Sequence, residues 1–448
     1  MERSTRKILN RSFSGLGVVS VLLLALSLIV ILAPMMIRGA KAYFFRATTE
    51  HREMILDVFE RGDREEIAAE AAEVAEARQP VYDMIDRFEA EMDTMGFMAS
   101  MEYGRKLDEL KDHLRELLGP LPDDREPALI RDRYGETRWD RAQEVLYDVM
   151  FIEEWDYSDP DAMGTKVYRP RVQDFEGTSL AALFPYVEEN MRSMLHPRFK
   201  FYWRFLFDTS EDAHFFGGIW PEVLGTIYLT LGALLFAIPM GVISAIYLTE
   251  YAHQGRIISI IRTSINTLAG VPSIVFGLFG LAFFINGVGV SASKSVLAGS
   301  LTLGLLIMPV VIRASEEAIL AVPIAYKEAA LGLGAGKWHT VLTVVLPAAL
   351  PGILTGIVIS MGRAAGETAP IIFTAAVSVG QPLGILDTLN EPTPALPWNI
   401  YNMATEHEAV DQLRHVQFGM VATLVALVLT LNMAAIILRA RIGKKLKG

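Results

Sequence analysis

Arg363 and Glu367 are charged residues in a segment that continues an apolar run at 340–362. Four residues apart on a helix, their side chains are neighbours and can neutralise each other. An arginine at membrane depth costs about 2.5–3.5 kcal/mol on insertion scales and is retained mainly where it pairs or lines a polar cavity. Its planar fork of donors also fits the oxygens of a dehydrated oxyanion. The pair predicts either an anion pathway, which we favour, or a structural ion pair.

Pro370 follows this pair and cannot donate a hydrogen bond to the carbonyl of Gly366. We therefore expect the helix to kink or break there. If it breaks, Thr368 would cap the next half-helix, whose N-terminus attracts anions. On this basis we assign Arg363, Glu367 and Thr368 to a substrate pathway.

The stretch 323–347 is too polar to face lipid and too apolar for an ordinary linker. It predicts a short helix at about 325–333 that ends at Gly334 in a left-handed cap, and then a second helix that runs up to Pro347. Small side chains at Ala329 and Ala330 would allow a partner to approach closely, and Glu328 offers it a carboxylate. The alternative is a plain helical hairpin without a partner.

Nucleotide binding by this stretch is excluded. The segment 332–337 resembles a phosphate loop, but Leu331 stands where that loop needs glycine and Trp338 stands where it needs a hydroxyl. The chain contains no cysteine, which excludes disulfides and thiolate metal sites. We expect no catalytic residue, no metal site and no cofactor bound by this chain.

The composition of the 448-residue chain places it in a membrane. It is 52% hydrophobic and only 21% charged, which excludes a disordered protein. The net charge of −11 is uneven, because residues 51–220 hold 21 basic and 39 acidic side chains. That balance argues against a nucleic-acid partner.

Six apolar runs are long enough to cross a bilayer, at 12–37, 223–249, 263–293, 295–312, 340–362 and 416–438. The first has no small-residue cleavage site and is expected to remain as an anchor. The third is too long for one helix, so we expect it to include a loop at Asn286–Gly289.

Lysine and arginine in the short loops give the orientation. Basic residues gather after the second, fourth and sixth runs, which puts both termini in the cytoplasm and the acidic block outside. The first half of that block reads as two helices separated at Pro80 and ended by Gly119 and Pro120. Such a domain without cysteine must be held together by packing.

The stretch 323–347 also carries a fixed spacing, E-A-A-x3-G-x9-I-x-L-P with valine in place of isoleucine. It resembles the signature loop of binding-protein-dependent ABC importer permeases, in which this element docks on the ATPase subunit. The residues that match are Glu328, Ala329, Ala330, Gly334, Val344, Leu346 and Pro347.

With the segment 362–370, residues 218–448 resemble the PstA-type permeases of bacterial phosphate importers. Further matching stretches are 243–252, 268–278 and 309–316. The resemblance implies that Arg363 and Glu367 line the substrate passage and that Glu328, Ala329, Ala330, Gly334, Leu346 and Pro347 couple to the ATPase. It also implies three kinds of partner: a homologous PstC-type permease, two PstB-type ATPases that use ATP and magnesium, and a PstS-type phosphate-binding protein.

We therefore expect an all-α polytopic protein of the bacterial inner membrane with six spanning helices in the type I importer permease fold. Residues 1–39 would form the cytoplasmic N-terminus and first span, 40–217 a mainly helical extracytoplasmic insertion, and 218–448 the permease core with its coupling loop at 313–346. The expected function is phosphate import. The alternatives are import of sulfate, molybdate or phosphonate, or a membrane-anchored sensor or scaffold that acts through its acidic domain.

Overall fold

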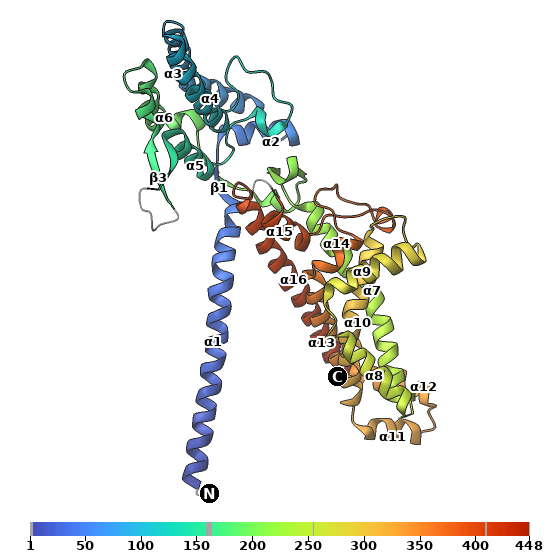
Figure 1. Ribbon diagram of the computed structural model, residues 1–448. Helices are drawn as coiled ribbons and strands as arrows, with labels where there is room; N and C mark the ends of the chain where they lie inside the picture. Colours follow the sequence, from blue (N-terminus) through green and yellow to red (C-terminus); the bar gives the residue numbers. More distant parts are fainter. Residues whose placement is uncertain (1–2, 158–163, 254, 408–409, 448) are drawn as a thin grey trace. The chain divides into compact units, whose positions relative to one another are not determined.

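The computed structural model describes residues 3–157, 164–253, 255–407 and 410–447 (Figure 1). The chain divides into two compact units. Unit 1 combines Met1–Ala42 with Arg204–Gly448, and unit 2 is Tyr43–Trp203. Unit 2 is thus narrower than the predicted 40–217 domain, because residues 204–217 pack with the start of the second apolar run instead.

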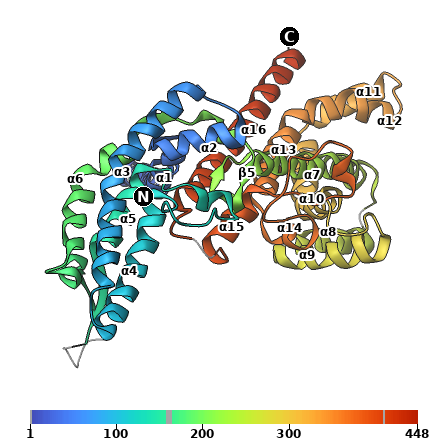
Figure 2. The same ribbon diagram turned by 90° about the horizontal axis from the view of Figure 1, so that it is seen from above.

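Unit 1 contains five helices long and apolar enough to cross a membrane: Ser12–Tyr43, Trp220–Tyr251, Val296–Leu320, Lys337–Gly366 and Arg414–Gly443. They are built from α1 (Arg3–Tyr43), α7 (Trp220–Ile246), α10 (Val296–Leu320), α13 (Leu346–Gly366) and α16 (Arg414–Lys447). Figure 2 shows α7, α10 and α13 gathered together within this unit. The prediction of a polytopic helical protein is confirmed.

The third predicted span is a bent pair of helices. α8 (Arg256–Leu268) and α9 (Ser273–Gly280) meet at 103°, and the π-helical segment η7 (Leu281–Val288) continues α9 until Gly289 takes a left-handed conformation. The pair makes a sixth span if it is counted as one. Residues Asn286–Gly289 were expected to form a loop inside the third span. In the structure they mark the place where the helical segment η7 ends. The sharper break lies at 269–272, where Pro272 has no amide hydrogen to continue α8.

Close approach of helices in unit 1 depends on small residues. A Cβ atom on Gly280 of α9 would lie 2.2 Å from the hydroxyl oxygen of Thr302 on α10. A Cβ on Gly39 of α1 would lie 2.5 Å from the backbone oxygen of Phe418 on α16. In contrast, the most apolar part of α1 is not buried against the rest of the described chain. α1 therefore contacts the unit near its C-terminal end.

Shorter elements complete unit 1. They are η4 (Trp203–Leu206), the ribbon of β5 (Ser210–Glu211) and β6 (Phe216–Gly217), η5 (Asp212–His214), η6 (Tyr247–Tyr251), α11 (Ile324–Gly332), α12 (Lys337–Thr340), η8 (Val341–Val345), α14 (Ala369–Thr374), η9 (Asp387–Leu389) and α15 (Leu396–Thr405). Figure 1 shows α11 and α12 at the end of the unit opposite α14 and α15.

Unit 2 is mainly helical, with two small antiparallel ribbons. Its helices are α2 (Thr49–Phe59), α3 (Arg64–Met92), α4 (Phe97–Leu118), η1 (Ile130–Arg133), α5 (Trp139–Met150), η2 (Arg171–Phe175), η3 (Ser179–Ala182) and α6 (Leu183–Leu195). β1 (Phe44–Ala47) pairs with β4 (Arg198–Phe201), and β2 (Phe151–Asp156) pairs with β3 (Thr165–Pro170).

Pro80 does not break the first helical region of unit 2, contrary to the prediction. α3 runs through it, and Asp63 caps its start by accepting hydrogen bonds from the amides of Glu65 and Glu66. The helix continues because Val81, Ile85 and Phe88 bury one face in the core, and this packing outweighs the hydrogen bond that proline removes. α2, α3 and α4 thus replace the expected pair of helices.

Unit 2 is held together by an apolar core and by buried charges. Leucines at helical spacing on α4, among them Leu107, Leu110 and Leu114, are fully buried with aromatic rings of neighbouring elements. The Arg78 guanidinium donates to the carbonyls of Met194 and Leu118 at 2.9 and 2.7 Å and pairs with Glu50. Packing and this network take the place of disulfides.

Glu136 makes the stability of unit 2 depend on pH. Its side chain is 16% exposed, and burial raises its pKa from 4.5 to about 7, with Arg141 at 3.6 Å acting in the opposite direction. The folded chain holds this proton where the unfolded chain has released it. The free energy of unfolding should therefore fall as pH rises from about 4.5 to about 7 and stay lower above that.

We expect Glu136→Gln to remove this component of the pH dependence. Hydrogen-exchange protection of α5 amides, corrected for intrinsic exchange, measures it between pH 5 and pH 8. Glu144→Gln is the matched control, because Glu144 is an exposed carboxylate that also pairs with Arg141. An unchanged slope in Glu136→Gln would contradict the assignment.

Candidate functional site

Arg363 lies in the last turn of α13, and its Nε donates to Oε1 of Glu367 at 3.2 Å. The side chains are 38% and 20% exposed, whereas the adjacent Ala364 and Ala365 are buried. Arg363 and Glu367 are therefore paired as the spacing predicted. They lie on the open face of α13 and are not enclosed in dry packing.

The helix breaks directly after this pair. α13 ends at Gly366, Glu367 has extended backbone (φ −81°, ψ 124°), and α14 begins at Ala369 with Pro370 in its first turn. Thr368 does not cap α14, because its backbone is helical (φ −97°, ψ −51°) and an N-cap needs extended backbone. Its hydroxyl instead donates to the carbonyl of Pro397 at 3.3 Å. The break was predicted correctly and the cap was not.

Polar atoms continue along the contact between α13 and α16. Asn432 of α16 faces Gly362, where a Cβ atom would lie 3.6 Å from its amide nitrogen. The Asn432 amide oxygen and the Ser360 hydroxyl are buried without a hydrogen-bond partner among the described residues. The sequence analysis did not single out Asn432, although an amide within the run 416–438 was the available signal. Two buried polar atoms without a partner in the described chain thus lie on the same two helices as the Arg363–Glu367 pair or against them.

The predicted hairpin is formed by α11 and α12. α11 ends in a Schellman motif, in which Gly334 has φ +86°, its amide donates to Leu331, and the amide of Ala335 donates to Ala330. No residue of α11 is buried, and exposed apolar side chains line the hairpin. The largest of these are Ile324, Tyr326, Leu333 and Trp338, with Leu333 90% exposed. Glu328 and Ala329 are exposed and Ala330 is half-buried.

The second helix of the hairpin does not end at Pro347. α12, η8 and α13 form one apolar helix over Lys337–Gly366, so Leu346 and Pro347 lie within it. The π-helical turn at Val341–Val345 precedes Pro347 and accommodates its missing amide donor. The second half of the hairpin and Arg363 consequently belong to one continuous helix.

An ion pair fixes the hairpin to the rest of unit 1. Lys327 of α11 pairs with Glu250 in η6, and both side chains are largely buried. The Lys337 ammonium lies 4.9 Å from the centre of the Tyr251 ring. No local pattern indicates either contact, because the partners are far apart in the chain and only the fold brings them together.

A second polar cluster was also missed. Glu222, in the first turn of α7, is 1% exposed and lies 2.8 Å from the His214 Nε2 and 3.0 Å from the Asn399 amide nitrogen. It joins η5, α7 and α15. Over the described ranges, no cluster of three or more histidine, aspartate or glutamate side chains is arranged to hold a metal.

Comparisons with known proteins agree with this architecture. Residues 237–448 match the family described as binding-protein-dependent transport system inner membrane component. The chain is 35% identical over 276 residues to a probable ABC transporter permease, YqgI of Bacillus subtilis, covering 60% of this chain and 91% of that protein. It is 39% identical over 226 residues to the phosphate transport system permease protein PstA 1 of Mycobacterium tuberculosis, covering 50% and 71%.

A solved structure of the MetNI methionine ABC transporter aligns with a TM-score of 0.38 and 19% identity, covering 50% of this chain and 94% of that one. The sequence relatives carry the assignment. The family match covers the exposed hairpin and the helix Lys337–Gly366 that follows it. The chain belongs to the family of binding-protein-dependent transport system inner membrane components, and within it to the PstA type.

The Lys327–Glu250 pair leads to a test of how the hairpin is held. Glu250→Gln leaves the Lys327 ammonium without its carboxylate, so α11 should open more often. Hydrogen exchange of the α11 amides should become about threefold faster or more, as for the loss of a partly buried pair. Glu317→Gln, at an exposed carboxylate on α10, should leave that exchange unchanged. Equal rates in the two variants would exclude an anchoring role for the pair.

Proposed function

We propose that this chain is the permease subunit of an ATP-driven importer of inorganic phosphate. The observation that carries the proposal is the accessible Arg363–Glu367 pair beside the break between α13 and α14. The similarity to phosphate permeases of the PstA type supports phosphate over other oxyanions.

In this proposal Arg363 replaces water around a passing anion. The residue lies about 24 Å of helix beyond Pro347, which is near or past the middle of a bilayer. Its guanidinium donates to phosphate oxygens in a low dielectric, where such bonds are strong. Glu367 competes for the same guanidinium, so the anion is held weakly enough to leave. Thr368 lies at the break beside the path, and its hydroxyl is held by the carbonyl of Pro397.

The hairpin is the docking site for the ATPase. Its exposed apolar side chains need a partner, the small Ala329 and Ala330 allow close approach, and Glu328 offers a carboxylate. Gly334 sets the turn between α11 and α12. Leu346 and Pro347 lie in the helix that runs from the hairpin to Arg363, so movement of the hairpin reaches the pathway directly.

The proposed assembly has this chain beside a homologous PstC-type permease, with two PstB-type ATPases in the cytoplasm and a PstS-type phosphate-binding protein outside. ATP and magnesium are used by the ATPases, and this chain supplies no catalytic residue. Both termini and the hairpin are cytoplasmic, and unit 2 lies outside the bacterial inner membrane.

Arg363→Gln tests the pathway. Without the guanidinium nothing replaces the water lost by the anion, so uptake of labelled phosphate should fall to about one-hundredth or less. The measurement uses a strain that lacks the native chain, with sulfate uptake as the control for the anion. Arg256→Gln, which removes an exposed arginine at the start of α8, should retain uptake. Normal phosphate uptake by an assembled Arg363→Gln transporter would refute the role.

Glu328→Lys tests the coupling surface. Reversal of this exposed charge should prevent the ATPase from copurifying or uncouple hydrolysis from transport, because a like charge repels the partner's basic side chain. The chain itself should still reach the membrane. Glu391→Lys reverses another exposed carboxylate, outside residues 313–346, and serves as the control. Full uptake with normal ATPase copurification in Glu328→Lys would remove the assignment.

A further inference from the structure

Unit 2 contains a cavity of about 450 Å³ where the ribbon of β1 and β4 meets the end of α6. Its lining is Arg46, Arg192, His196, Pro197 and Arg198. Three arginines and a histidine thus face one space, and no carboxylate is among the lining residues. The charge of the cavity lining is therefore opposite to that of the surrounding region, because acidic residues outnumber basic ones by 39 to 21 over residues 51–220.

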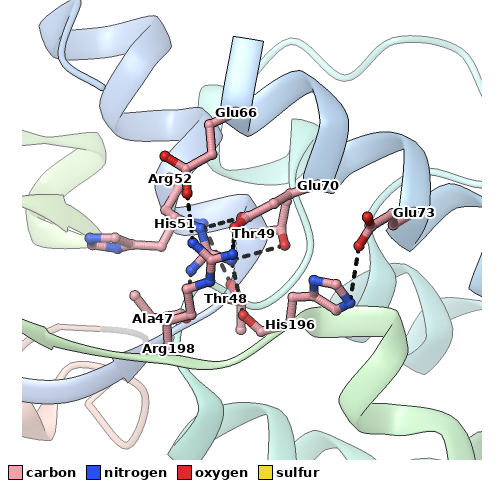
Figure 3. A network of polar contacts seen from close by, with 10 residues as sticks. All are labelled: Ala47, Thr48, Thr49, His51, Arg52, Glu66, Glu70, Glu73, His196 and Arg198. Carbon is pink, nitrogen blue, oxygen red and sulfur yellow. Dashed lines mark hydrogen bonds and ion pairs between the residues drawn. The ribbon is translucent and has the colours of Figure 1, made fainter. Parts of the chain in front are cut away.

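Arg198 and His196 are held from one side of the cavity. Arg198 pairs with Glu66 at 2.9 Å and also with Glu70, both on α3. His196 lies 3.9 Å from Glu73, one turn further along α3 (Figure 3). The carboxylates of α3 therefore fix the positions of Arg198 and His196 without lining the cavity.

Arg46 and Arg192 have no such partner. Arg46 of β1 and Arg192 of α6 are exposed, and neither guanidinium has an ion pair or hydrogen bond among the described residues. Two unpaired guanidiniums that line one space repel each other, and an anion between them relieves that repulsion. Their planar donor forks suit the oxygens of a phosphate group.

The C-terminal end of α6 would normally repel an anion, because its last carbonyls carry partial negative charge. Here those carbonyls are occupied. Arg78 donates to the carbonyl of Met194, and Arg52 donates to that of His196 at 2.9 Å. The amide of His196, in a left-handed conformation with φ 40°, donates to the carbonyl of Arg192. Arg78 and Arg52 thus neutralise the negative end of the helix, and Figure 3 shows Arg52 beside His196.

We propose that this cavity binds a phosphate group, at a site separate from the Arg363 pathway. Two sources have this chemistry. Inorganic phosphate is one, and a lipid headgroup is the other, because Arg46 is three residues beyond the end of the spanning helix α1, or at most about 10 Å of chain. The exposed rings of Phe44, Phe199 and Phe201 on the same ribbon are typical of a membrane–water interface.

The test uses the full chain in phosphatidylcholine nanodiscs and equilibrium binding of labelled inorganic phosphate. All variants carry Arg363→Gln, so that the pathway contributes nothing and failure of the proposed transport function is measured separately. Arg46→Gln/Arg192→Gln should weaken phosphate binding about tenfold or more. Arg87→Gln removes an exposed arginine elsewhere on α3 and should have no effect. Arg192→Lys keeps the charge without the fork and should give an intermediate affinity.

A second experiment tests whether the phosphate group belongs to a lipid headgroup. The same variants in nanodiscs that contain phosphatidylglycerol are analysed by native mass spectrometry for retained anionic lipid. Loss of phosphate binding in the double variant assigns the site to the free ion, and loss of retained lipid alone assigns it to a headgroup. Circular dichroism checks that the double variant is folded. If a folded double variant matches Arg87→Gln in both experiments, the proposal is overturned.

Discussion

A charge at membrane depth must be paired or hydrated, and this constraint organises unit 1. Arg363 meets it with Glu367 one helical turn away and with an open face on α13. The break at Gly366 adds polar groups beside this pair. Pro370 prevents a continuous helix, and the backbone next to the pair is left polar. An isolated arginine in lipid would raise the free energy of the folded chain in the membrane. The partner carboxylate and the open face reduce that cost.

The mechanical part of the structure is the continuous helix over Lys337–Gly366. The exposed hairpin lies at one end of this helix and the charged pair lies at the other. No loop interrupts the helix between them, so a displacement of one end is passed to the other. The Lys327–Glu250 pair ties α11 to the end of α7. Movement at the hairpin is therefore shared by at least two spanning helices.

Local patterns in the sequence predicted local structure well. Apolar runs gave the spans, Gly334 gave the left-handed cap, and the spacing of Arg363 and Glu367 gave their ion pair. One failure occurred where distant packing decided the outcome. α3 continues through Pro80 because its face is buried. The bend of the third run at 269–272 has a local cause, because Pro272 cannot continue α8. The cap at Thr368 is absent because that residue has helical backbone and its hydroxyl donates to the carbonyl of Pro397.

The contacts that no pattern indicated join residues far apart in the chain. Glu222 meets Asn399, Lys327 meets Glu250, and Arg46 shares a cavity with Arg192. Each involves an ordinary residue type in an ordinary local context, so only the fold distinguishes it.

The sparse packing of α1 has a consequence for how this chain can change over generations. Most of its apolar length touches no other part of the chain, so its leucines, isoleucines and valines are interchangeable as far as this subunit is concerned. Gly39 is the opposite, because any side chain there meets the backbone of α16. Drift along the helix is therefore permitted, while a single glycine near its end is under strict steric selection.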